Sequence, residues 1–119
     1  MYKINRQFSS SLYDENPELA IGYFSENLWR ACRLVVDTGI HGLGWTREDA
    51  IDFLFENTAV GSKQFAAQEI DRYITWPGQA LAYKMGQRKI MALRKLFENE
   101  LGSAFDLKKF HLYTLFCYG

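Results

Sequence analysis

Apolar residues recur at helical spacing over residues 19–35, which predicts a first long helix. Asn16 suits its N-cap, and Pro17 suits its first turn, where a missing backbone N–H costs nothing. We expect Gly39 to end this helix, because glycine readily adopts the left-handed conformation that often follows one. The three glycines within residues 39–45 then predict a tight connector.

Further helices follow in the same pattern of apolar positions. Thr46 is a suitable N-cap for the second helix, and Asp49 stands where a capping box usually has Glu or Gln. A third helix is predicted over about residues 62–74, and a fourth ends before Gly102. The first half of the fourth helix, residues 80–85, is apolar nearly all round, which predicts deep burial.

These segments define the fold class as all-α, since neither an alternating strand pattern nor an internal repeat is found. We expect a compact bundle of about four main helices, because long helices joined by short loops favour antiparallel neighbours. Asp106 is expected to cap a short last helix that reaches Phe110. Residues 1–15 are polar and predict a loose lead-in, followed by a single helical domain over residues 16–119.

Composition excludes several classes of protein. Hydrophobic residues make up 48% of the chain, which argues against disorder. The formal net charge is zero, whereas nucleic-acid binders usually carry a basic excess, so no nucleic-acid partner is expected. The chain has neither the apolar core of a signal peptide at its start nor a run of roughly 18 apolar residues, so we expect a soluble chain without a membrane partner. The compartment of a longer parent stays open.

The cysteines and histidines offer little chemistry by spacing alone. Cys32 is expected to be a buried small apolar residue and Cys117 an incidental thiol. The chain has two histidines, His41 and His111, and no cluster with metal-ligand spacing, so no metal residue is predicted. His41 lies in the glycine-rich segment, where it could face a cleft or could simply bond a nearby carbonyl and fix the loop.

A polar stripe marks the fourth helix. Gln79, Tyr83 and Gln87 recur every four residues and therefore share one face, and Lys84 lies beside them in an otherwise apolar stretch. Such a stripe on a buried helix needs partners or a wet cleft. Hydrogen bonding between helices in the core is the alternative.

Long strings of residues resemble the C-terminal region of the bacterial domain-of-unknown-function family 885. The resemblance runs from about Gly22 to Leu115. It is specific, because the strings occur unbroken and in the right order. They are residues 22–23, 28–31, 33–41, 44–52, 56–59, 71–74 and 76–84.

This family is similar to helical gluzincin-type zinc peptidases, and its members are mostly uncharacterised. The resemblance implies that this chain is a C-terminal part of a larger helical zincin-like fold. Full-length relatives carry an H-E-x-x-x-H-like zinc motif and a further acidic ligand upstream of the matched region. This sequence contains neither, so zinc is expected in those relatives and no cofactor in this chain. The sequence also stops short of the family's usual end, which a truncated or frame-shifted gene would explain.

The resemblance also implies roles for particular residues. In a zinc peptidase the metal activates water, and other groups stabilise the developing oxyanion. His41 and Tyr83 are the candidate catalytic residues for oxyanion or substrate contacts, and Tyr73 could replace Tyr83. Each role is a hypothesis, because the family's own catalytic residues are not assigned.

A carboxypeptidase must also hold the carboxylate of its peptide substrate. The resemblance makes Arg72 and Lys84 the candidates for that contact, and Gln79 would orient one of them. The zinc-bearing N-terminal part would then be the missing partner, and the chain alone would be inactive.

Two other functions compete with a peptidase part. A stand-alone helical binding or scaffold module would have covered its apolar surface or would self-associate, whereas a severed part should expose the face that met the zinc-bearing half. A complete small enzyme would need a pair such as Asp37 and His41, for which no nucleophile is evident.

Overall fold

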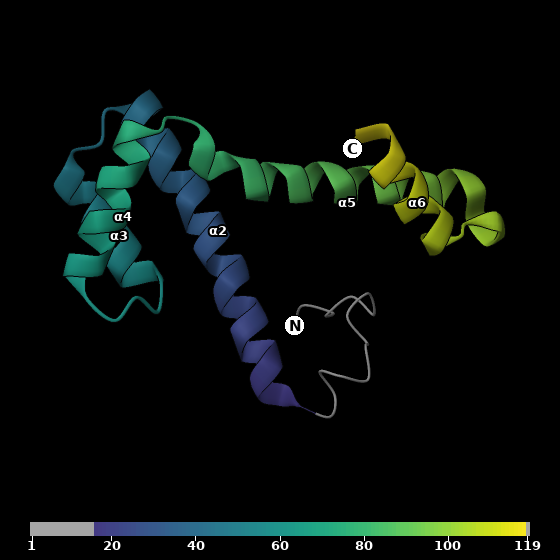
Figure 1. Cartoon of the computed structure of the whole chain (residues 1–119), viewed down its shortest axis with the longest axis horizontal. Helices are drawn as coiled ribbons and strands as arrows, with labels where there is room; N and C mark the ends of the chain where they lie inside the picture. Colours follow the sequence, from purple (N-terminus) through teal and green to yellow (C-terminus); the bar gives the residue numbers. More distant parts are fainter. Residues whose placement is uncertain (1–15, 119) are drawn as a thin grey trace. The chain divides into compact units, whose positions relative to one another are not determined.

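The computed structural model of the protein describes residues 16–118, with side chains to residue 116. Every secondary-structure element in that range is a helix, which confirms the all-α class (Figure 1). The predicted lead-in and the Cys117 side chain lie outside what is described. Contacts divide the chain between Ala82 and Tyr83 into two compact units. The single domain over residues 16–119 therefore stays a prediction.

The first unit packs three α-helices and a 3-10 helix around one small core. Its elements are α2 (Pro17–Leu43), α3 (Arg47–Asn57), α4 (Lys63–Thr75) and η2 (Gln79–Leu81). Helices α3 and α4 pack against each other and against the C-terminal half of α2, as Figure 1 shows. The core consists of residues from all four elements: Cys32, Val36, Ala50, Ile51, Leu54, Ala66, Ile70, Tyr73 and Ala80.

The prediction that Gly39 ends the first helix is wrong. Helix α2 continues to Leu43, and Gly44, at a φ of 72°, is the left-handed residue that follows it. Gly39 instead allows the Trp45 ring to pack closely against the helix, because a Cβ at this position would lie 2.4 Å from a ring carbon of Trp45. The backbone N–H of Trp45 also donates to the Gly39 carbonyl at 2.9 Å. The predicted connector is therefore mostly the last turn of the helix, and it places His41 on that turn.

The helix starts follow the sequence more closely. The Thr46 N–H donates to Asp49 Oδ2 at 2.9 Å, and the Asp49 N–H donates to Thr46 Oγ1 at 3.1 Å, so the capping box is complete. Ser62 caps α4 by accepting from the Phe65 N–H at 3.2 Å. These contacts are local, so the residue types that make them can be recognised from spacing alone.

Helix α4 buries only part of its apolar surface. Ala66, Ile70 and Tyr73 are buried, but Phe65 and Ile74 remain 49% and 37% exposed. The buried residues recur every three or four positions and form a narrow stripe. Phe65 and Ile74 lie at its edges.

The second unit contains α5 (Ala82–Leu101), η3 (Gly102–Ala104) and α6 (Leu107–Tyr118). Gly102, at a φ of 50°, follows α5 as predicted. Asp106 Oδ1 accepts from the backbone N–H groups of Lys108 and Lys109 at 2.8 and 3.2 Å, which confirms the cap. The last helix is longer than predicted and reaches Tyr118.

The predicted deep burial of residues 80–85 is wrong for most of that segment. Ala80 is buried, but it belongs to η2. Tyr83 and Met85 of α5 are 58% and 41% exposed, and α5 has no buried residue within the described structure. An apolar pattern shows that a helix has surface to bury, but the pattern does not supply the surface that covers it.

Candidate functional site

Five polar or aromatic side chains gather in the first unit, and we call them the arginine cluster. They are Arg33 of α2, Glu69, Arg72 and Tyr73 of α4, and Gln79 of η2. Gln79 Oε1 accepts from Arg33 at 3.0 Å and from Arg72 at 3.2 Å. Arg72 also holds Glu69 at two points, through Nε at 3.3 Å and its terminal nitrogen at 2.6 Å. The cluster thus joins two guanidinium groups through one amide oxygen.

Tyr73 lies at the centre of the cluster and is only 1% exposed. Its hydroxyl donates to Glu69 Oε2 at 2.7 Å. The guanidinium carbons of Arg33 and Arg72 lie 5.3 and 4.8 Å from the centre of its ring, within the range of a cation–π contact. The Tyr73 side chain therefore contacts three charged groups.

These contacts shift two pKa values in opposite directions. Burial alone raises the pKa of Glu69, but the hydrogen bonds from Arg72 and Tyr73 outweigh it, so the pKa is lowered overall. Burial, followed by the hydrogen bond to Glu69, holds the pKa of Tyr73 well above its usual range. At neutral pH, therefore, Glu69 is an acceptor and Tyr73 a donor.

Asp37 supplies a second buried carboxylate near the cluster. It is 2% exposed, and its two oxygens accept from the Gly78 N–H at 3.2 and 3.1 Å. This contact fixes the turn that precedes η2 and therefore the position of Gln79. With Asp37 and Glu69 counted against Arg33 and Arg72, the formal charges of the region balance.

His41 contacts the cluster through the backbone. Its Nε2 lies 3.0 Å from the Tyr73 carbonyl oxygen. A carbonyl only accepts, so Nε2 must carry the proton, and in the neutral ring Nδ1 is then an acceptor. This geometry agrees with the alternative in which His41 bonds a nearby carbonyl, although the residue is exposed. Its catalytic role stays a prediction.

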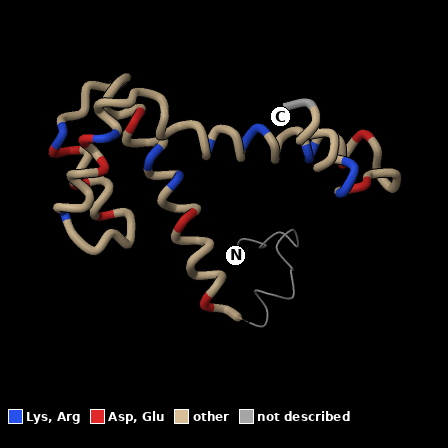
Figure 2. Tube along the Cα trace, viewed as in Figure 1, with Lys and Arg blue, Asp and Glu red and all other residues tan. Residues whose placement is uncertain are grey.

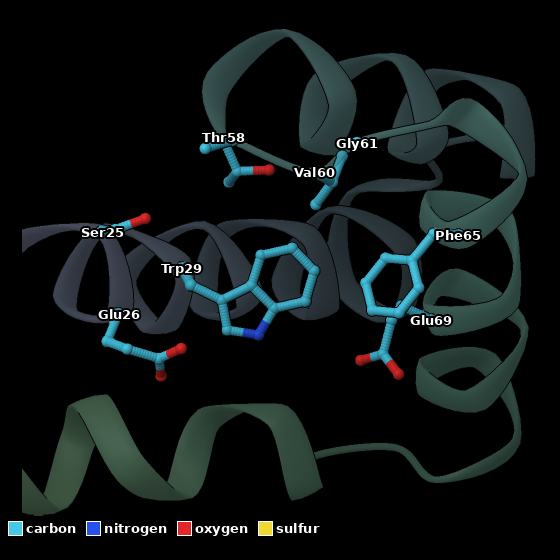
Figure 3. A pocket seen from close by; sticks show the side chains of 9 residues that line it. Ser25, Glu26, Trp29, Thr58, Val60, Gly61, Phe65 and Glu69 are labelled. Carbon is cyan, nitrogen blue, oxygen red and sulfur yellow. The ribbon is translucent and has the colours of Figure 1, made fainter. Parts of the chain in front are cut away.

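A cavity of about 450 Å³ opens beside the cluster, between α2, the loop at residues 58–61 and α4 (Figure 3). The centres of the Trp29 and Phe65 rings lie 6.2 Å apart in its wall. Figure 3 shows the carboxylates of Glu26 and Glu69 on either side of the Trp29 indole. Glu69 belongs to both the cavity and the cluster.

The structure brings together three of the six predicted site residues in one network and ties a fourth to it. Arg72, Tyr73 and Gln79 share the arginine cluster, and His41 binds the backbone of Tyr73. Tyr83 and Lys84 lie on α5 in the second unit, so their participation stays a prediction.

Sequence reasoning missed Arg33 and Glu69. Both carried a signal, because Arg33 and Asp37 are charged residues four positions apart on the apolar side of α2, and Glu69 lies three and four positions before Arg72 and Tyr73.

Within residues 16–118, no three His, Cys, Asp or Glu side chains are grouped so that they could hold a metal ion. None of the helices in that range has the length and apolar character to cross a bilayer. Acidic and basic positions are interspersed along them, as Figure 2 shows.

Comparison with known proteins gave two matches. A family model described as "Bacterial protein of unknown function (DUF885)" matches residues 9–115. A crystal structure described as "the putative lipoprotein from Colwellia psychrerythraea" is 46% identical with a TM-score of 0.80. The match covers 83% of this chain but only 17% of that longer one. No curated protein matches.

Proposed function

The chain belongs to the bacterial family of unknown function DUF885. We propose that it supplies the substrate-binding part of a longer zinc-dependent peptidase of the carboxypeptidase type. The remainder of the longer protein would hold the zinc and act as the partner of this chain, which would be inactive alone. The match to 17% of a longer relative supports such a parent. Because that relative is described as a lipoprotein, export of the parent is part of the proposal.

The observation that carries the proposal is the convergence of Arg33 and Arg72 on Gln79 Oε1. A carboxylate oxygen in that position would accept two charge-assisted hydrogen bonds, each roughly twice as strong as a bond to a neutral group. Arg72 is the guanidinium that a substrate can reach, since its side chain is 37% exposed, whereas Arg33 is buried. Arg72 already binds one carboxylate, that of Glu69, at two points.

The placement of the hydrogen-bond donors, and not the net charge of the region, would determine how a substrate carboxylate binds. Asp37 and Glu69 offset the two arginines, so a peptide carboxylate would gain little from the net charge of the region. It would gain from displacing the neutral Gln79 oxygen between two donors. Gln79 would then orient Arg72 in the free protein, and its side-chain oxygen would be displaced by the carboxylate when substrate binds. Lys84 is the second candidate for the carboxylate.

The candidate oxyanion groups differ in their availability. The Tyr73 hydroxyl is donated to Glu69, so Tyr83, at 58% exposed, is the better candidate for direct contact with substrate. His41 donates its Nε2 proton to the Tyr73 carbonyl and could donate through Nδ1 only as the imidazolium.

The test is a chimera in which this chain replaces the matched segment of the Colwellia relative, loaded with zinc. Hydrolysis of a peptide with a free C-terminal carboxylate is compared with that of the amidated peptide. Arg72→Gln should raise KM for the free acid by about tenfold or more, because hydrogen bonds to charged groups contribute about 1.5–3 kcal/mol. KM for the amide should not change.

Arg47→Gln is the matched control. Arg47 also holds a carboxylate at two points, through Asp71 at 2.7 and 2.9 Å, but it lies outside the cluster. It should leave both KM values unchanged. If neither the relative nor the chimera hydrolyses peptides with zinc bound, the peptidase assignment is wrong. If hydrolysis occurs but Arg72→Gln behaves like Arg47→Gln, only the role of Arg72 is wrong.

A further inference from the structure

The second unit leaves most of its apolar side chains uncovered. Among residues 83–116, only Phe110 is buried. Units shorter than about 40 residues rarely bury enough surface to be stable without disulfides, metals or a partner surface. The large exposed apolar side chains include Phe97, Leu101, Leu112, Tyr113, Leu115 and Phe116, at 46%, 47%, 51%, 65%, 72% and 79%.

Part of this surface is a shaped groove of about 390 Å³ between α5, η3 and α6. Leu93, Phe97 and Leu101 recur every four residues and form its α5 wall. The ring of Phe110, on α6, lies 6.0 Å from that of Phe97 and 6.1 Å from that of Phe105. The rings thus form a continuous apolar floor.

We propose that this groove binds an amphipathic helix from the part of a longer DUF885 protein that lies outside these 119 residues. The inference deepens the proposed function by locating the contact with the missing part, and it rests on the longer parent but not on zinc or on peptidase activity. A groove between two helices with an apolar floor is the usual docking site for the apolar face of a third helix. Asp106 and Lys109 at its edge would meet opposite charges on that helix.

The family match and the length of the solved relative favour this occupant. The family match over residues 9–115 includes every residue that lines the groove, so the groove lies within the part of the chain that the family shares. In the solved relative, 46% identical, the matched segment is 17% of the chain, so most of that longer protein lies outside the matched segment. A second copy of this chain is the competing occupant.

The test compares the isolated chain with the chimera described above. Phe97→Glu should lower the Tm of the chimera by several degrees more than Leu96→Glu. Leu96 is a neighbouring leucine of α5, 53% exposed, that does not line the groove. In the isolated chain the difference between the two variants should be smaller, because both positions are exposed there and only the contact between the Phe97 and Phe110 rings distinguishes them. Equal shifts in the chimera would overturn the proposal.

Thiol labelling gives a second measurement that does not depend on a destabilised variant. Phe97→Cys is combined with Cys117→Ser, and Cys32 reacts slowly because it is buried. Labelling at position 97 should be at least tenfold slower in the chimera than in the isolated chain. Equal rates would show that nothing covers the groove. A dimeric isolated chain with position 97 protected would assign the groove to a second copy instead. Neither readout involves hydrolysis, so each proposal can fail separately.

Discussion

Replacing Gly39 by alanine should destabilise the first unit, although the same change in a helix interior is normally stabilising. Alanine is favoured over glycine by about 1 kcal/mol at such positions. At Gly39, however, the new Cβ would lie 2.4, 2.6 and 2.9 Å from three ring carbons of Trp45. Normal carbon–carbon contacts are about 3.5–4.0 Å, so the indole must move by about 1 Å or more.

The free-energy cost of Gly39→Ala depends on the packing contacts that the Trp45 indole would lose when it moves. The Trp45 ring packs on Phe53, with ring centres 5.4 Å apart, and the backbone N–H of Trp45 is bonded to the Gly39 carbonyl, which holds the main chain that carries the ring. Overpacking of this kind costs about 1–3 kcal/mol, and a rigid ring that packs on Phe53 and is carried by a hydrogen-bonded main chain places the cost near the top of that range. After the gain of about 1 kcal/mol in helix propensity, the net loss in free energy of unfolding is about 2 kcal/mol.

Gly22→Ala is the matched control, because Gly22 lies in the same helix and a Cβ there meets nothing within 4 Å. It should stabilise by about 0.5–1 kcal/mol. Urea unfolding followed by circular dichroism gives both free energies, and tryptophan fluorescence reports the displaced indole. A Gly39→Ala variant as stable as Gly22→Ala would refute the close approach of Trp45.

Further predictions concern the cap, the cluster and the turn. Thr46→Ala removes the capping box of α3 and should lower the free energy of unfolding, measured in urea, by about 1 kcal/mol. Thr38→Ala is the control: it removes a hydroxyl that donates to the Leu34 carbonyl of its own helix, and it should change the free energy of unfolding less. Because the pKa of Glu69 is lowered by folding, its contribution to stability is present above the unfolded carboxyl value of about 4.3 and is lost as pH falls through the lower folded value. Glu69→Gln should therefore flatten the fall in Tm over that pH window, and an unchanged acid profile would contradict the assigned contacts. Asp37→Ala removes the acceptor of the Gly78 N–H and should cost about 1–3 kcal/mol in urea unfolding, with faster hydrogen exchange at Gly78.

The sequence predicts those parts of the fold that depend on near neighbours. Thr46 and Asp49 cap α3 through contacts three residues apart, so their spacing was sufficient. Ser62 makes the same contact with Phe65, although it was expected as the first residue of the helix and not as its cap. Gly39 was misinterpreted because glycine can end a helix or admit a neighbouring ring, and only the position of Trp45 decides between the two.

The site depends on longer connections. Arg33 and Gln79 are 46 residues apart in the chain, and no local pattern indicates that they meet. The exposed face of α5 is the opposite case, in which the local pattern was recognised but its burial was predicted wrongly. Its apolar pattern was recognised, but within the second unit the described structure contains too little surface to cover it.

The contacts of Tyr73 restrict where relatives can gain or lose residues in this part of the chain. Its ring, hydroxyl and carbonyl each engage a different partner, from both α2 and α4. One residue inserted or deleted in α4 before Tyr73 would rotate it by about 100° about the helix axis and break its contacts with Arg33 and His41 of α2. A change between Glu69 and Tyr73 would also break the hydrogen bond of the hydroxyl. Insertions and deletions in relatives should therefore be confined to the loop at residues 58–61, where the chain can lengthen without turning the helix that follows.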